Sequence, residues 1–280
     1  MLGIFEKRVF CDYLAYISNR AISSGLGGIN VLLGVMLYSF VIYLDFDACS
    51  NIAIGTARML GFSIPKNFNS PYLSATLKEF WTRWHISLSS WFKDYVYIPL
   101  GGNRKGKIRQ YILILLVFVL SGVWHGSTFN FLIWGILHGV FRIVEDIVLM
   151  PFKNMGKVPR TFVRPFGIVL NFLLISFLWL LFRYSSFDQV IGIVSSMFVF
   201  RPLSLQEMGL TANEQYWLCI VLIAVIIMDI LRNRFDVLEC YAKLWLPLRW
   251  GGYLLLIVVF LVFGVYGGNF SASDFIYQYF

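Results

Sequence analysis

Residues 110–150 read QYILILLVFVLSGVWHGSTFNFLIWGILHGVFRIVEDIVLM, and this stretch decides the fold. It contains two apolar runs, 110–123 and 129–150, which are separated by a short turn. Each run approaches the roughly 20 residues with which a helix crosses the hydrocarbon core of a bilayer. The stretch therefore predicts a hairpin of two membrane-spanning helices. It also places His125 at the turn and His138 near the middle of the second run.

The rest of the chain has the same apolar character. Of its 280 residues, 59% are hydrophobic and only 14% are charged, whereas roughly half of an ordinary soluble domain is apolar. Further apolar runs lie at 27–46, 166–182, 216–231 and 253–266, with a marginal one at 187–200. A backbone in lipid must satisfy its own hydrogen bonds, and the alternating pattern of barrel strands is missing from the sequence. We therefore expect an all-α membrane protein, a multi-span helical bundle that forms a single membrane domain over 1–280.

The positive charge is concentrated in short loops beside the predicted spans. The formal net charge is +8, and most of the excess Lys and Arg falls in 101–109, 151–164 and 232–249. This distribution is typical of the positive-inside bias of membrane proteins, which predicts that these loops are cytoplasmic. We therefore expect a multi-pass protein of the cell (plasma or inner) membrane, with the lipid bilayer and no nucleic acid as a partner.

Residues 67–107 form the least apolar region between the predicted spans. Thr76 and Glu79 have the spacing of a helix-capping box, and apolar residues then recur at helical spacing at Leu77, Phe80, Trp84, Leu88 and Trp91. The pattern predicts one amphipathic helix with His85 on its polar stripe and an ion pair between Glu79 and Arg83. The segment is either an interfacial helix with His85 at the lipid headgroups or a re-entrant segment that carries His85 to a site.

His125 occupies a position where a titratable side chain needs an explanation. Ionisable groups at membrane depth are costly and usually face a cavity, a partner or a substrate path. Gly122 and Gly126 bracket the histidine, which permits a helix end and a close approach of backbone. Both a functional histidine and a structural histidine bonded to a carbonyl fit this pattern.

His138 has a less specific context. Trp134 and Arg142 lie one turn before and after it on the same helical face, and Arg142 is spaced to pair with Asp146. Packing or hydrogen-bond support is the favoured role for this histidine. The spacings among the three histidines match no zinc motif, so we expect no metal site.

Several segments of the chain carry a more specific pattern: YLDF at 43–46, NIAIGTARMLGF at 51–62, NFNSPYLSATLKEFWTRWHISLSSWFKDYVYIPLGGNRKG at 67–106 and GVWHGSTFNFLIWGILHG at 122–139. Together they resemble the membrane-bound O-acyltransferase (MBOAT) family, in its bacterial alginate O-acetyltransferase-like branch. The combination of RWH, then IPLGGNR, then WHG is highly specific to that family.

The resemblance implies a bundle of tilted and broken helices around a tunnel. An acyl thioester such as acetyl-CoA would enter as a substrate rather than a bound cofactor. The acyl group would pass toward an exported or cell-surface polysaccharide, or to an extracytoplasmic acetyltransferase partner. Position by position, the resemblance makes His125 of WHG and His85 of RWH the catalytic residues. Supporting or tunnel-lining positions would be His138, Trp84, Trp124, Arg83 and Asp45.

In the mechanism favoured by this resemblance, His125 acts as general base on an acceptor hydroxyl while His85 positions a reactant or polarises the carbonyl. A covalent acyl-histidine or a relay to a partner enzyme uses the same residues.

The chain also departs from the family pattern. DACSN at 47–51 replaces the usual continuation of the DF motif, whereas FIYQYF at 275–280 resembles the family's aromatic C-terminal end. The first residues, GIFEKRVFCDYLA, resemble a segment well inside typical members, so we expect the family's N-terminal helices to be absent. Two other functions therefore stay open. One is a transporter or proton relay lined by Asp45, His125, His138 and Arg142, and the other is an inactive truncated fragment.

Overall fold

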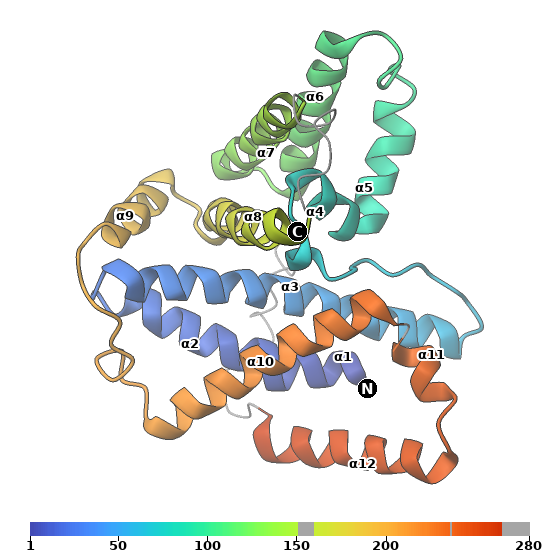
Figure 1. The fold of residues 1–280 in the computed structure, drawn as a ribbon, viewed down its shortest axis with the longest axis vertical. Coiled ribbons are helices and arrows are strands. Elements are labelled where there is room, and N and C mark those ends of the chain that lie inside the picture. The colour runs from blue at the N-terminus through green and yellow to red at the C-terminus, as the bar shows by residue number, and fades with distance from the viewer. Residues whose placement is uncertain (151–159, 236, 265–280) are drawn as a thin grey trace. The chain divides into compact units, whose positions relative to one another are not determined.

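A computed structural model describes residues 1–150, 160–235 and 237–264, and these residues form helices without a β-strand among them (Figure 1). They divide into two compact units. Unit 1 comprises Met1–Ser70 and the described residues from Ser195 onward, and unit 2 comprises Pro71–Val194. Five helices are long and apolar enough to cross a membrane, namely Gly28–Met59, Lys107–His125, Val163–Arg183, Ala212–Arg234 and Leu246–Phe263. The protein is therefore an all-α membrane protein.

The predicted spans differ in detail from the helices. The run 27–46 continues as helix to Met59, and the run 253–266 begins earlier, at Leu246. The run 129–150 is a helix whose second half carries three charged side chains, Arg142, Glu145 and Asp146, and it is not among the five candidate spans. The predicted cytoplasmic loop 232–249 contains a short helix. Part of the predicted loop 151–164, residues 151–159, lies outside the described residues, as does the aromatic C-terminal end 275–280.

Unit 1 is built around one long helix. Its elements are α1 (Leu2–Phe5), the π-helical turn η1 (Glu6–Cys11), α2 (Asp12–Ser23), α3 (Gly28–Met59), α10 (Ala212–Arg234), α11 (Val237–Ala242) and α12 (Leu246–Phe263). α2 folds back along α3 (Figure 1), and the hydroxyl of Ser18 donates to the carbonyl of Gly34 at 2.7 Å. Thr211 and Glu214 form a reciprocal capping box that fixes the start of α10.

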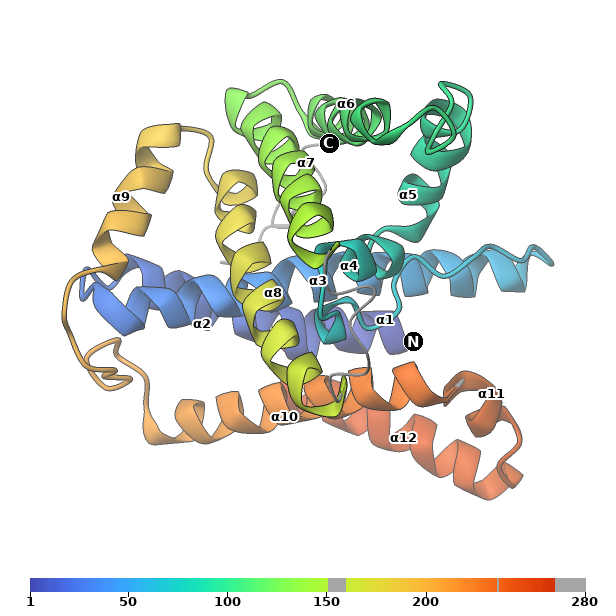
Figure 2. The ribbon, with the colours of Figure 1, turned by 45° about the horizontal axis from the view of Figure 1, so that its top comes forward.

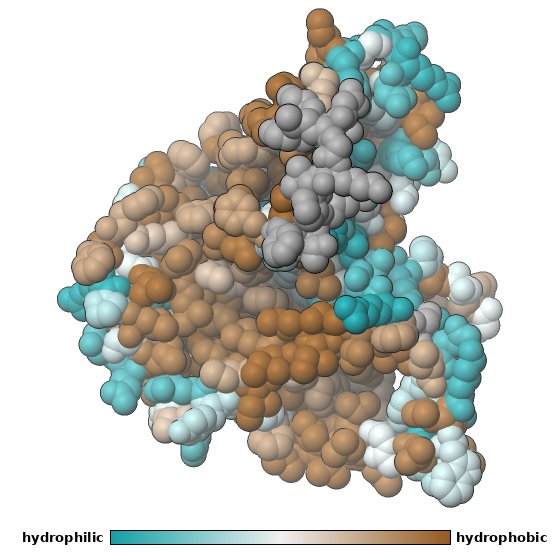
Figure 3. Space-filling view, in the orientation of Figure 1, coloured by the Kyte–Doolittle hydropathy of each residue, from teal (hydrophilic) through white to brown (hydrophobic). Residues whose placement is uncertain are grey.

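The outward surface of unit 1 matches a lipid environment. The best 18-residue window of α12 is 0% buried, although its mean hydropathy is 2.0. Figure 3 shows apolar side chains covering α10 and α12, and the exposed ones on α12 include Leu254, Leu255, Val258, Leu261 and Val262. Such a surface is unfavourable in water but is the expected outer face of a membrane-spanning helix.

Unit 2 carries both motif histidines and His138. Its elements are the short turn η2 (Pro71–Leu73), α4 (Leu77–Arg83), α5 (Ile86–Phe92), the π-helical turn η3 (Lys93–Tyr97), α6 (Lys107–His125), α7 (Phe129–Leu149) and α8 (Arg160–Arg183). α9 (Phe187–Met197) continues across the boundary at residue 194.

α6 and α7 form the predicted hairpin, in which a short loop joins them (Figure 2), and they pack closely against each other. Glycines permit the approach, because a Cβ at Gly122 would overlap the carbonyl oxygen of Phe131, and one at Gly135 would overlap that of Phe118. Small residues at such positions let helix backbones meet in membranes.

The prediction of one amphipathic helix after Thr76 is wrong. The hydroxyl of Thr76 accepts from the backbone N–H of Glu79 at 3.1 Å as predicted, but α4 ends at Arg83 and α5 starts at Ile86. His85 between them has φ +43°, a left-handed conformation that costs energy for a residue other than glycine. The break allows Trp84 to be buried, while Trp91, expected on the same apolar face, is 51% exposed.

Candidate active site

The site is centred on His125, which is the last residue of α6 and is only 3% exposed. Aromatic rings enclose its imidazole. The ring centroids of Trp124, Trp134 and Phe182 lie 4.9, 5.3 and 5.0 Å from it, each with an edge-to-face geometry. These rings come from α6, α7 and α8, so three helices of unit 2 together create a water-poor surrounding for one titratable side chain.

His85 comes to the same place from the break between α4 and α5. Trp84 anchors the break because its ring stacks on Phe80 at 5.4 Å and lies 4.9 Å from Trp179. The His85 ring is 8% exposed, and its centroid is 6.5 Å from that of His125. The predicted position on a polar stripe is therefore wrong, because ending α4 at Arg83 turns the imidazole into the unit.

The local environment keeps His85 neutral. Burial lowers its pKa to about 4, because the charged imidazolium loses its hydration there. Its Nδ1 lies 3.4 Å from the hydroxyl of Ser87, and its ring is 6.2 Å from that of Trp124. At neutral pH this imidazole offers one N–H donor and one lone pair.

His138 lies one turn after Trp134 on α7 and is fully buried. The indole Nε1 of Trp81 donates to its Nδ1 at 3.4 Å, and the Trp134 ring contacts it at 4.7 Å between centroids. Arg142, on the same helix, pairs with Glu145 at 3.5 Å, and the carboxylate of Asp146 contacts Lys107 at 3.2 Å. The ion pair of Arg142 with Asp146 stays a prediction.

Glu145 links α7 to the start of α4. Its carboxylate accepts from the backbone N–H groups of Leu77 at 2.5 Å and Lys78 at 3.0 Å. These donors belong to the first turn of α4, where N–H groups have no partner within the helix. Glu145 therefore fixes the helix that leads to His85 against the helix that carries His138.

The other predicted positions fall in different places. Trp124 lies beside the two motif histidines and is 54% exposed, whereas Trp84 is buried. Arg83 forms the predicted ion pair with Glu79 at 2.9 Å. Asp45 belongs to unit 1, where it is buried on α3 and pairs with Lys7 at 2.6 Å.

Sequence reasoning missed three rings of the enclosure: Trp81, Trp179 and Phe182. Trp81 lies one turn before His85, and the other two are spaced i,i+3 on α8. Only this helical spacing of large aromatics could have suggested them. Among the described residues, no three His, Cys, Asp or Glu side chains converge as metal ligands would. The imidazole groups of the enclosure can transfer protons, and its imidazole and indole groups can form hydrogen bonds.

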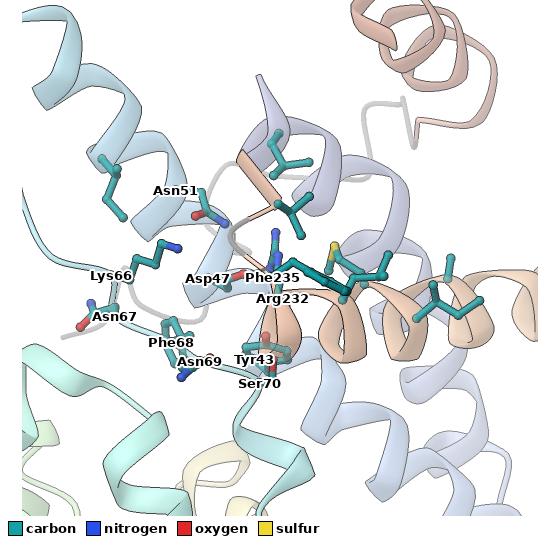
Figure 4. A pocket seen from close by; sticks show the side chains of 17 residues that line it. Tyr43, Asp47, Asn51, Lys66, Asn67, Phe68, Asn69, Ser70, Arg232 and Phe235 are labelled. Carbon is teal, nitrogen blue, oxygen red and sulfur yellow. Dashed lines mark hydrogen bonds and ion pairs between the residues drawn. The ribbon is translucent and has the colours of Figure 1, made fainter. Parts of the chain in front are cut away.

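Unit 1 contains a separate cavity of about 470 Å³ (Figure 4). Its lining includes Tyr43, Asp47, Asn51, Lys66, Phe68 and Arg232. The guanidinium of Arg232 contacts Asp47 at 2.6 Å and also the carboxylate of Glu6, which accepts from the Asn51 amide at 2.9 Å. The divergent segment 47–51 thus contributes to a buried ion network that the sequence did not suggest.

Comparisons with known proteins agree with this architecture. Residues 13–187 match the sequence model of the MBOAT, membrane-bound O-acyltransferase family. The chain is 35% identical over 245 residues to a probable alginate O-acetylase of Azotobacter vinelandii, covering 87% of this chain and 47% of that protein. It is 33% identical over 215 residues to a peptidoglycan O-acetyltransferase of Helicobacter pylori, covering 76% and 40%.

A more distant similarity links it to a teichoic acid D-alanyltransferase of Streptococcus thermophilus, at 34% identity over 56% of this chain and 41% of that protein. The chain spans about half the length, or less, of these curated relatives. The family match covers the two motif histidines and the hairpin that holds His125 and His138, and the described helices are those of a membrane protein. The chain therefore belongs to the MBOAT, membrane-bound O-acyltransferase family.

Proposed function

We propose that the protein is a membrane O-acyltransferase that moves acetyl groups from a thioester donor, such as acetyl-CoA on the cytoplasmic side, toward an exported or cell-surface polysaccharide. The proposal also places it in the inner membrane of a bacterium. The observation that carries the proposal is the pair His85 and His125, 6.5 Å apart in one aromatic enclosure. At this spacing a single reacting group can contact both imidazoles.

The reaction uses the two histidines in different ways. His125 takes the proton of an acceptor hydroxyl as its oxygen attacks the thioester carbonyl carbon. The carbon–oxygen bond forms, the carbon–sulfur bond breaks, and the leaving thiolate receives a proton from His125. His85, neutral at pH 7, positions the hydroxyl or donates a hydrogen bond to the carbonyl oxygen. The buried surroundings keep water from competing with the hydroxyl.

The names of the relatives support the choice of acyl group and acceptor. Two of them are described as O-acetylating enzymes for alginate and for peptidoglycan. Both acceptors carry sugar hydroxyls on the outer side of the cell membrane. An acetyl carrier or an extracytoplasmic acetyltransferase could receive the group first, in which case His125 serves the same proton transfer or itself holds the acetyl group.

The proton-relay alternative has less support. It requires Asp45, His125, His138 and Arg142 along one path, yet Asp45 is paired with Lys7 and Arg142 with Glu145. Paired charges of this kind are held in place by their partners rather than offered to a moving proton.

The experiment compares His125→Ala with Ser127→Ala, which alters an exposed residue of the turn beside the site. Each variant is produced in a bacterium that exports an acetylated polysaccharide, and both acetyl ester content and protein abundance are measured. We expect His125→Ala to lower acetylation about 10²-fold or more at normal abundance, which is the scale for loss of a general base. Ser127→Ala should match the parent. Normal acetylation in His125→Ala would refute the proposed role.

A further inference from the structure

Two buried N–H donors next to His125 have no acceptor among the described residues. These are the indole Nε1 of Trp134 and the imidazole Nε2 of His138, both on side chains that are fully buried. A buried donor without a partner is unfavourable, because it has lost its hydrogen bonds to water and gained none in return. Two of them side by side in a folded protein therefore require an explanation.

The hydrogen bond from Trp81 fixes which nitrogen of His138 carries the proton. Because the indole of Trp81 donates to Nδ1 of His138, that nitrogen presents its lone pair and the ring proton lies on Nε2. His138 is thus a neutral donor through Nε2. Trp134 is a donor as well, since an indole has no acceptor nitrogen. The two groups cannot satisfy each other, so only an acceptor brought from outside the pair can satisfy them.

The surroundings of Trp134 and His138 indicate what kind of acceptor can reach their N–H groups. Trp134 and His138 are one turn apart on α7 with ring centroids 4.7 Å apart, and the Trp134 ring also contacts His125 at 5.3 Å. Two phenyl rings also border the pair. Phe118 lies parallel to the His138 imidazole at 5.9 Å, and Phe182 lies 4.8 Å from the Trp134 ring.

Neutral donors in such a setting suit an oxygen that gains negative charge, because hydrogen bonds to it strengthen where water is excluded. We propose that Trp134 Nε1–H and His138 Nε2–H bind the carbonyl oxygen of the acyl group, one lone pair each, and hold the charge that develops on it. The inference rests on the proposed acyl transfer and adds the residues that would stabilise its transition state.

The electrons balance in this step. As the acceptor oxygen bonds to the carbonyl carbon, one electron pair of the C=O bond moves onto the oxygen held by the two donors. It returns when the carbon–sulfur bond breaks and the thiolate leaves. Neither donor gives up its proton during the step.

The test removes one N–H at a time while keeping an aromatic ring. Trp134→Phe deletes the donor. Trp179→Phe is the matched control, because the Trp179 ring is in the same cluster, 6.0 Å from Trp134, but its N–H already donates to the hydroxyl of Tyr72 at 3.1 Å. His138→Phe deletes the second donor, and His138→Gln keeps an N–H at that position.

Acetyl transfer is measured with the full 280-residue chain in lipid vesicles, and unfolding of each variant is followed in parallel. We expect kcat to fall about 10²-fold in Trp134→Phe, the scale for losing one oxyanion donor. His138→Phe should behave likewise, and His138→Gln should recover most of the rate. Trp179→Phe should lose stability through its broken hydrogen bond and should lower kcat much less than Trp134→Phe, because the N–H that it loses already has a partner.

Infrared spectra of bound acetyl-CoA, with ¹³C at the acetyl carbonyl, separate this inference from the proposed function. The parent and His125→Ala should shift the carbonyl band to lower wavenumber, and Trp134→Phe should not. If the parent transfers acetyl groups but Trp134→Phe matches it in rate and band position, the donor pair is refuted and the acyl transfer stands. If the shift is present without any transfer, the donor pair is supported and the proposed function is refuted. Absence of a shift in the parent overturns the inference.

Discussion

Replacing Arg232 by alanine should destabilise unit 1 more than any substitution on its surface. The guanidinium contacts the carboxylates of both Asp47 and Glu6. These two residues are buried, with exposed fractions of 5% and 0%. Removing one partner from a buried ion pair typically costs 3–5 kcal/mol, because the remaining charge stays buried without compensation. Here two carboxylates lose their cation, while the amide of Asn51 still donates to Glu6. We expect a loss of about 4 kcal/mol in the free energy of unfolding.

Two further variants test the cause of this loss. In Arg232→Lys the compact ammonium keeps the positive charge but lacks the planar guanidinium that can bind two carboxylates at once. The loss in the free energy of unfolding should therefore be about half as large. Combining Arg232→Met with Glu6→Gln and Asp47→Asn removes all three charges and should restore most of the stability. Recovery in the triple variant would show that the uncompensated charge, rather than the lost side-chain volume, causes the destabilisation.

The measurement is reversible unfolding in mixed micelles by titration with a denaturing detergent, followed by tryptophan fluorescence. Arg201→Ala is the control, since its ion pair with Glu207 is 3.9 Å long and both side chains are more than half exposed. Exposed pairs contribute about 0–1 kcal/mol, so this variant should stay close to the parent. If Arg232→Ala loses no more stability than Arg201→Ala, the buried network is not what holds η1, α3 and α10 together.

His85→Gln should make the stability of the protein less sensitive to acid. Burial lowers the pKa of His85 from 6.5 in the unfolded chain to about 4 in the folded protein. Between these two pH values the unfolded chain binds the proton more tightly, so the parent loses stability as the pH falls through the interval. Unfolding at pH 7 and pH 4.5 measures this, and an equal loss in both proteins would contradict it. Gly135→Ala should separate α6 from α7, because its new methyl group meets the carbonyl oxygen of Phe118, and we expect a loss of about 1–3 kcal/mol in the same detergent titration. Lys105→Cys, in the exposed basic loop after η3, should react with an impermeant thiol reagent only from the cytoplasmic side. Labelling of this cysteine in intact cells from outside would show that the predicted orientation is wrong.

Much of the fold was readable from the sequence because the signals were long and periodic. The apolar runs on either side of the WHG turn correspond to α6 and α7 to within three residues at each end, because long apolar runs predict helices. The end of α3 was missed by more than three turns. Its second half buries Asp45 and Asp47 in ion pairs, and such charges look like the end of a span when their partners are unknown.

The candidate site was predicted only in part. Motif resemblance singled out His85 and His125, and the two rings do meet in one enclosure. The left-handed turn at His85 could not be foreseen, because helical spacing favoured a continuous helix and only tertiary packing of Trp84 repays the strain. The partners of His138 were also hidden, since Trp81 is 57 residues away in sequence.

The glycine contacts of the α6–α7 hairpin have a consequence for how this chain is made. Gly122 meets Phe131, and Gly135 meets Phe118, so the contacts that close the hairpin join residues that emerge from the ribosome within moments of one another. Short-range contacts of this kind cost little chain entropy and form early. The contact of His125 with Trp134 joins residues only nine positions apart, so it depends on this hairpin and on no later helix. One contiguous stretch of the chain, α6 with α7, therefore encodes the contacts between His125, Trp134 and His138.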